Sequence, residues 1–185
     1  MNDHVSEPLP AFRYHKDPLA SGSVVESLKK CKCCQRARGF IYTGPVYAEK
    51  DLGEALCPWC IADGSAAEKF EATFVDAEAF ADDAPEAAMT EILERTPGFS
   101  AWQSERWPSC CGEPAAFVMP AGIAEIRARF YQLEGSLMMH IVHEMGISGG
   151  AARQILESLR RDQSPTVFVF KCQHCDTQPF YVDQL

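Results

Sequence analysis

The sequence has no long apolar run. None of its hydrophobic stretches approaches the roughly 18 to 20 residues that a membrane-spanning helix needs. Its first ten residues, MNDHVSEPLP, lack the basic start and the apolar core of a signal peptide, so we expect a cytoplasmic protein with no membrane contact. Disulfides are rare in that compartment because thiols stay reduced there.

Familiar catalytic motifs are missing as well. The sequence contains no glycine-rich phosphate loop and no G-x-S-x-G motif. His140 and His143 stand three residues apart in HIVHE, whereas the zinc-protease motif H-E-x-x-H spaces its histidines by four and places the glutamate between them. We therefore expect helix histidines that are partly buried, no catalytic residue, and a protein that is not an enzyme.

Basic residues are scarce between residues 61 and 105. This segment carries eleven Asp and Glu residues against only Lys69 and Arg95, so its net charge of −9 equals that of the whole chain. An acidic chain is a poor general nucleic-acid binder, because attraction to phosphate dominates that affinity. The segment is either a solvated acidic surface or a docking surface for a basic protein, since opposed charge raises association rates and selects partners.

Contacts with such a partner are expected where the helix signal of the acidic segment is weakest. An apolar anchor would have to accompany these charges, and Trp59, Phe74 or Phe80 could supply it. The expected partner-binding residues are Asp76, Glu78, Asp82, Asp83 and Glu86.

The chain divides into three parts by pattern. Residues 1–30 mix aromatic, charged and Pro/Gly/Ser residues and predict an irregular arm. Residues 31–70 predict a zinc-ribbon module, with two short strands around Gly44-Pro45. Residues 71–185 predict an α+β remainder with a helical middle and a C-terminal β-hairpin that carries a cysteine knuckle. We expect this remainder to pack with the ribbon as one compact unit, which makes the fold class α+β.

The helical middle is predicted from apolar periodicity. Helices are expected over 86–95, over 122–146, where Gly135 weakens the centre, and over 150–162. The last two resemble a helix-turn-helix, but little beyond Arg153 and Gln154 could read bases, so we favour core packing.

Nine cysteines are the most informative feature of the chain. Cys31 and Cys34 form one C-x2-C pair, and Cys57 and Cys60 form a second one 22 residues later. Two such knuckles supply the four thiolates that zinc takes in a tetrahedron. Three alternatives stay open: buried free cysteines, a redox dithiol at CPWC ahead of a helix, and Cys33 in place of Cys34.

Basic residues crowd the first knuckle. They either compensate the negative charge of a four-thiolate zinc or form a small nucleic-acid-binding ribbon. These residues are Lys29, Lys30, Lys32, Arg36 and Arg38.

A second cysteine set predicts a second zinc site less strongly. Cys172 and Cys175 form another C-x2-C pair, with His174 inside it, and the adjacent Cys110 and Cys111 could complete the site. Three or four ligands from these five residues would suffice. The main objection is that adjacent cysteines rarely ligate one ion comfortably.

Several short stretches together resemble the CbrC family of bacterial proteins, which is known for colicin tolerance. They are FRYHKDPL, YTGPVY, CPWCIADGSAAEKF, RTPGFSAWQSERW, CCGEPAAFV and the late CQHC followed by YVD. The resemblance implies zinc knuckles at the first four cysteines and a second set that involves Cys111, Cys172 and Cys175. This chain has Ala115 where family members often have a further cysteine, so Cys110 would have to replace it.

The resemblance implies protection against a bacterial toxin. Relatives of that family resemble immunity proteins, which cover a nuclease toxin and block its substrate path. The leading expectation is therefore a non-enzymatic zinc-binding inhibitor of a basic nuclease toxin. A zinc-ribbon nucleic-acid-associated or regulatory protein and, more remotely, a zinc enzyme with an open coordination position are the alternatives.

Overall fold

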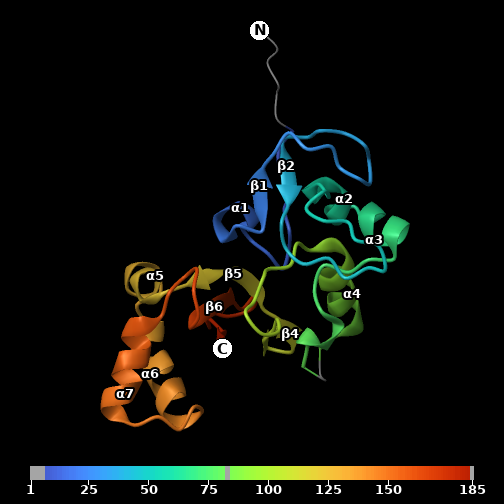
Figure 1. Ribbon diagram of the computed structural model, residues 1–185. Helices are drawn as coiled ribbons and strands as arrows, with labels where there is room; N and C mark the ends of the chain where they lie inside the picture. The colour runs from blue at the N-terminus through green and yellow to red at the C-terminus, as the bar shows by residue number, and fades with distance from the viewer. Residues whose placement is uncertain (1–6, 82–83, 184–185) are drawn as a thin grey trace.

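Helices and small antiparallel sheets make up the protein, as the predicted α+β class requires (Figure 1). The computed structural model describes residues 7–81 and 84–183. Two of the expected partner contacts, Asp82 and Asp83, lie outside the described residues. Within the described ranges, no helix combines the length and the apolar character that crossing a membrane demands.

The helices and strands follow one another in mixed order along the chain. The helices are α1 Pro18–Ser21, α2 Pro58–Ala62, α3 Ser65–Phe70, the 3-10 turn η1 Ala77–Ala79, α4 Glu86–Arg95, α5 Ile123–Arg129, α6 Leu133–His143 and α7 Gly149–Ser158. The strands are β1 Val24–Glu26, β2 Phe40–Tyr42, β3 Ser109–Cys110, β4 Glu113–Pro114, β5 Ala116–Ala121, β6 Thr166–Lys171 and β7 Phe180–Asp183.

The strand pair predicted around Gly44-Pro45 is wrong. Strand β2 pairs instead with β1, which comes from the segment expected to be an irregular arm, and Val25 lies opposite Ile41. Tyr47, on the other side of the turn, forms an isolated bridge to Thr73. The segment after the turn begins with a proline, which has no N–H to donate to a ladder. The cysteine pairs are therefore not separated by a ribbon hairpin of their own.

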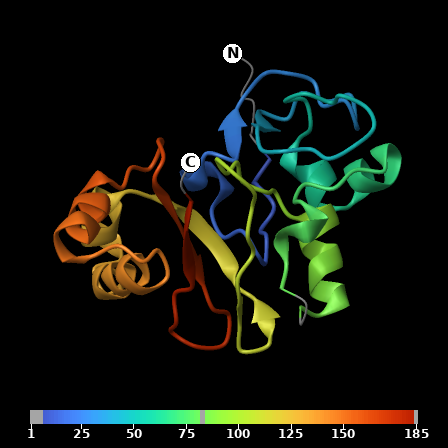
Figure 2. The same ribbon diagram turned by 60° about the horizontal axis from the view of Figure 1, so that its bottom comes forward.

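The C-terminal strands belong to a three-stranded antiparallel sheet of order β5-β6-β7. Strand β6 is buried on both faces, because its side chains alternate between two apolar clusters. Phe168 and Phe170 enter an aromatic cluster around Phe99, whereas Val167 and Val169 enter the cluster formed by α5, α6 and α7. The sheet thus lies between helices α5, α6 and α7 on one side and the rest of the chain on the other (Figures 1 and 2).

The helix predicted over 86–95 is confirmed as α4, but the one predicted over 122–146 is not continuous. It breaks at Phe130, whose backbone leaves the helical region. A straight helix of that length would measure about 37 Å and would extend past the sheet. The break lets both halves bury apolar residues in one cluster, which includes Ile126 and Leu137. Helix α7 adds Ala152 to the same cluster, so its apolar face serves the core.

A buried histidine ties the N-terminal segment to the loop after α4. His15 has no exposed surface. Its Nδ1 lies 2.6 Å from the carbonyl oxygen of Pro97, so Nδ1–H donates there, and its Nε2 accepts from the Ser21 hydroxyl at 2.7 Å. Burial lowers the pKa of His15 from 6.5 to about 4, so the imidazole is neutral near pH 7.

We expect the stability of the fold to fall as pH drops from about 6.5 to about 4 through His15. The unfolded chain binds the His15 proton more readily in that window, so acid favours unfolding. Between pH 7 and pH 5 this contributes a loss of about 2 kcal/mol. Urea titrations of wild type and His15→Gln at both pH values test this. The variant starts less stable but should lose about 2 kcal/mol less over the interval; equal losses would contradict the assignment.

Candidate metal centres

The first cysteine tetrad consists of Cys31, Cys34, Cys57 and Cys60. Their sulfur atoms all lie within 4.8 Å of one another. The Sγ–Sγ distance is 3.9 Å both between Cys31 and Cys60 and between Cys34 and Cys57. Four thiolates at about 2.3 Å from a central zinc are about 3.8 Å apart, so the spacing suits a tetrahedral ion. A disulfide would need about 2.05 Å, and all four cysteines are free.

Local backbone geometry forms each half of this tetrad. Cys31 and Cys34 flank a turn in which the Gln35 N–H donates to the Cys31 carbonyl at 2.8 Å. Cys57 is the N-cap of α2, and Pro58 occupies its first turn, where a missing N–H costs nothing. Cys60 follows on the same short helix. The CPWC sequence therefore begins helix α2 and places both of its sulfur atoms at the first turn of that helix.

Backbone donors favour the thiolate form of Cys31. The N–H groups of Cys33 and Cys57 each lie 3.3 Å from its sulfur. A hydrogen bond from the Cys57 thiol, together with these backbone N–H groups, lowers the pKa of Cys31 to about 4. Metal ions bind thiolates, so this environment prepares Cys31 as a ligand.

Cys33, the rival of Cys34, lies outside the tetrad. Its sulfur is 3.6 Å from the Ser65 hydroxyl. A redox dithiol at Cys57 and Cys60 would leave the two nearby sulfurs of the first knuckle without a role. The sequence could not separate Cys33 from Cys34, because only the turn geometry decides which side chain points inward.

The second tetrad consists of Cys110, Cys111, Cys172 and Cys175, again with all sulfur atoms within 4.8 Å. Cys175 Sγ lies 3.8 Å from that of Cys110 and 3.7 Å from that of Cys111. The two adjacent sulfurs are 3.9 Å apart. These distances also match the edge of a zinc–thiolate tetrahedron. This centre joins the β3–β4 turn to the connection between β6 and β7.

A tight turn explains how adjacent cysteines can share one centre. Cys110 pairs with Glu113, so Cys111 and Gly112 form the two-residue loop of the β3–β4 hairpin. Both loop residues have positive φ, 55° and 76°, as in a type I′ turn. The left-handed backbone at Cys111 turns its side chain to the same side as that of Cys110. This answers the objection to adjacent ligands.

A backbone N–H and a side-chain hydroxyl each contact one sulfur atom of the Cys172–Cys175 knuckle. The His174 N–H donates to the Cys172 sulfur at 3.4 Å. The Thr177 hydroxyl lies 3.2 Å from the Cys175 sulfur and is the first cause that lowers the pKa of Cys175 to about 6. His174 itself is not among the four sulfur-bearing residues that surround the centre.

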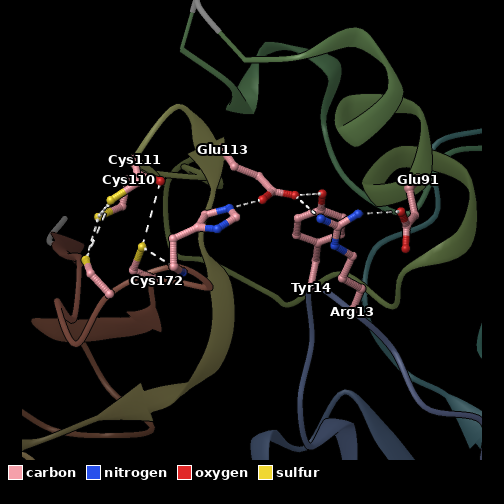
Figure 3. A network of polar contacts seen from close by, with 9 residues as sticks. Arg13, Tyr14, Glu91, Cys110, Cys111, Glu113 and Cys172 are labelled. Atoms are coloured by element: carbon pink, nitrogen blue, oxygen red, sulfur yellow. Dashed lines mark hydrogen bonds and ion pairs between the residues drawn. The ribbon is translucent and has the colours of Figure 1, made fainter.

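A polar network connects the second tetrad to the N-terminal segment (Figure 3). The Glu113 carboxylate accepts from the Tyr14 hydroxyl at 2.7 Å and also contacts Arg13 and the Nε2 of His174. The Tyr14 hydrogen bond is the first cause that lowers the pKa of Glu113. Arg13 continues to Glu91 of α4 at 3.9 Å. Sequence reasoning missed this network, because about a hundred residues separate Glu113 from Tyr14.

Three of the five basic residues around the first tetrad have partners within the chain. Lys32 Nζ donates to the Leu52 carbonyl at 2.7 Å, Lys29 pairs with Glu54 at 3.4 Å, and Arg38 pairs with Glu7. These contacts favour a role in the local structure over a nucleic-acid-binding surface.

The expected contact residues of the acidic segment have different environments. Glu78 and Glu86 are exposed, whereas the Asp76 carboxylate caps η1 by accepting from the Glu78 N–H at 2.9 Å. Glu105 is buried, accepts from the Asp76 N–H at 2.8 Å, and has its pKa raised to about 7 by burial. The predicted anchors Trp59 and Phe74 are buried and cannot meet a partner.

A hollow between α3 and α4 gathers other acidic side chains of the segment. It measures about 550 Å³. Its charged lining residues are the acidic Asp63, Glu68, Glu71 and Glu94 and the basic Arg95.

Comparison with known proteins places the chain in a family. The model described as "Uncharacterised protein family (UPF0167)" matches residues 9–184. The chain belongs to the UPF0167 family. UPF0167 protein Mb2317 of Mycobacterium bovis is 43% identical over 180 residues, which cover 96% of this chain and 94% of the relative. UPF0167 protein PA1536 of Pseudomonas aeruginosa is 39% identical over 181 residues, covering 97% and 99%. No solved structure matches the chain.

The resemblance to the CbrC family is therefore wrong. The family match and the relatives carry the UPF0167 name over nearly the whole chain. The names of the family and of these relatives state no activity, so colicin tolerance and toxin immunity lose the support that the resemblance gave them. The two cysteine tetrads of this UPF0167 protein do not depend on it, because they follow from sulfur positions.

Proposed function

We propose that this UPF0167 protein binds one zinc ion at each cysteine tetrad. The observation that carries the proposal is the presence of two separate sets of four free thiols with sulfur–sulfur distances of 3.7–3.9 Å where measured. Four soft thiolates in a tetrahedron select zinc or iron over hard cations. Zinc is the better fit for two isolated knuckle sites that brace a small fold in a reducing compartment such as the cytoplasm.

The two zinc ions are proposed to be structural, and the protein non-enzymatic. A catalytic zinc keeps one coordination position for water or substrate, whereas each tetrad fills all four positions with sulfur. The first tetrad lies inside the apolar cluster formed by β2, α2 and their neighbours, where it takes the place of a larger hydrophobic core. The second tetrad holds the β3–β4 turn on the three-stranded sheet.

We propose that the acidic segment binds a basic protein partner. The motive is the charge distribution, since residues 61–105 carry the whole net charge and the remaining chain is neutral. The exposed Glu78 and Glu86 and the acidic hollow between α3 and α4 are the parts that a partner can reach. A nuclease toxin is one basic partner of this kind, because surfaces that bind DNA are positively charged. The support for such a partner is the charge distribution alone.

Charge reversal tests the docking proposal. In Glu78→Lys/Glu86→Lys the two changes lie on the exposed part of the segment and spare the Asp76 cap. A partner is first isolated by pull-down with the wild-type protein. We expect the association rate of the variant with this partner to fall about tenfold at low salt, with a weaker salt dependence than wild type. Zinc content should stay unchanged. Stopped-flow association kinetics and metal analysis give the two readouts.

A control with the same change in net charge separates surface position from total charge. Glu26→Lys/Glu144→Lys places the same two reversals on exposed residues outside the segment. This control should associate at close to the wild-type rate. Equal losses in both variants, or no loss in either, would show that the acidic segment is only a solvated surface.

A further inference from the structure

The two tetrads differ in their exposure to solvent. In the first, Cys31 and Cys57 have no exposed surface, Cys60 is 2% exposed, and only Cys34 is partly exposed. In the second, Cys111 and Cys175 are both exposed, and only Cys172 is buried. Four-thiolate sites of similar geometry therefore present different surfaces to small reactive molecules.

The sulfur atoms of the exposed pair are also in contact with each other. Cys111 and Cys175 lie 3.7 Å apart, against 3.8 Å for Cys110 and Cys175. Closing this gap to the 2.05 Å of a disulfide needs a shift of less than about 2 Å. Cys111 lies in an exposed two-residue turn, and Cys175 lies in a connection between strands, so neither strand has to move.

We propose that the second tetrad is an oxidant-reactive thiolate site, in which hydrogen peroxide oxidises Cys111 and Cys175 to a disulfide. The inference rests on the proposed zinc occupancy and extends it, because it assigns a reactivity to one centre only. The first tetrad reacts more slowly under the same conditions, since three of its four cysteines are buried in an apolar cluster and only Cys34 is partly exposed.

The chemistry balances with peroxide as the two-electron oxidant. The Cys175 thiolate attacks one peroxide oxygen, the O–O bond breaks, and Cys175 becomes a sulfenic acid while hydroxide leaves and takes up a proton as water. The Cys111 thiolate then attacks the Cys175 sulfur and displaces its oxygen, which leaves as hydroxide and becomes a second water. Two electrons pass from the sulfurs to the peroxide, and one S–S bond forms. The centre keeps two thiolates, which are too few to hold zinc firmly.

Oxidation at this position would reach the N-terminal segment through the polar network. His174 lies between Cys172 and Cys175 and contacts Glu113, which accepts from Tyr14. The Cys172 thiol also approaches the Cys110 carbonyl at 3.8 Å. Release of the metal frees the knuckle that holds His174 in place, so the Glu113–Tyr14–Arg13 contacts lose one of their supports.

Peroxide titration of the zinc-loaded protein tests the proposal. Zinc release is followed with a chromophoric chelator, and disulfides are mapped by mass spectrometry after rapid alkylation. One of the two zinc ions should leave on the order of tenfold faster than the other. The zinc-free chain should lose two hydrogens in mass before alkylation and should take up two fewer alkyl groups, with Cys111 joined to Cys175. A thiol reductant with added zinc should restore the starting state.

Two variants sharpen the result. Cys111→Ser also removes a ligand of the second zinc, so its disulfides are followed and not its zinc release. The Cys111–Cys175 disulfide should be absent, and any remaining oxidation should join Cys110 to Cys175. Cys33→Ser, which changes a thiol outside both tetrads, should behave as wild type. Equal release of both zinc ions, or first oxidation at any cysteine of the first tetrad, Cys34 included, would overturn the proposal. Zinc analysis before treatment separates the proposed zinc occupancy of the second tetrad from its proposed reactivity with peroxide. One bound ion contradicts the second centre itself, whereas two ions that both survive peroxide contradict only its reactivity.

Discussion

Cys57→Ser is expected to remove the first zinc ion and to unfold the part of the chain built around it. Cys57 is fully buried, caps α2 and donates its N–H to the Cys31 sulfur at 3.3 Å. Structural zinc binding in small modules contributes roughly 10–16 kcal/mol, which equals or exceeds the whole stability of a typical domain. The loss of one ligand therefore should leave little folded protein. Metal analysis and circular dichroism with urea titration measure both effects.

Matched cysteine variants make this prediction specific. Cys33→Ser changes a neighbouring thiol outside the tetrad and should keep both zinc ions and near-normal stability. Cys175→Ser should lose the second ion only, with a smaller loss of stability, because that centre braces an exposed turn and not a core. A Cys57→Ser protein that is folded and holds two zinc ions would contradict the first centre.

Gly98→Ala is expected to destabilise the protein by about 3 kcal/mol or more, because overpacking against a backbone has no flexible neighbour to give way. A Cβ atom at Gly98 would lie 1.9 Å from the carbonyl oxygen of Phe74. The Gly98 N–H also donates to the Tyr42 hydroxyl at 3.1 Å, which bonds the Phe74 carbonyl. This glycine allows the loop after α4 to approach the first apolar cluster closely.

Gly135→Ala is the control for the glycine prediction and should have the opposite sign. Gly135 lies inside α6, and a Cβ there would meet nothing within 4 Å. Alanine restricts the unfolded chain and suits a helix, so we expect a gain of about 0.5–1 kcal/mol. Urea midpoints of both variants are the measurement. A tolerated Gly98→Ala would show that the Phe74 backbone can move.

Local patterns of the sequence predicted the features that depend on near neighbours. The C-x2-C spacing at Cys57 and Cys60 predicted a knuckle, and the structure makes it the first turn of α2. Apolar periodicity over 86–95 predicted α4 with its observed bounds. The C-terminal residues predicted one strand before and one strand after a cysteine knuckle, and the structure has β6 and β7 there, with β6 buried on both faces. In each case the deciding interactions lie within about four residues or one strand.

The distribution of charge along the chain could be determined from the sequence, but the exposure of each charged side chain could not. Counting placed the net charge between residues 61 and 105. The structure shows that Glu105 is buried and that the Asp76 carboxylate caps η1, so neither is freely exposed. Other carboxylates of the segment line the hollow between α3 and α4. Composition counts charges, whereas accessibility depends on what packs over them.

Tertiary structure alone decided the contacts between distant segments. Strand β2 pairs with β1 and not with the strand that the sequence predicted after Pro45. Strand pairing depends on which segments the fold brings side by side. The positive φ of Cys111 decided that adjacent cysteines can face one centre, and the different depths of the two tetrads decided which of them meets solvent. The sequence by itself determined which residues could bind metal, since ligand type and local spacing are properties of the chain. Only folding determined which sulfurs meet, how deeply they lie and what they touch, because packing brings together residues far apart in the sequence.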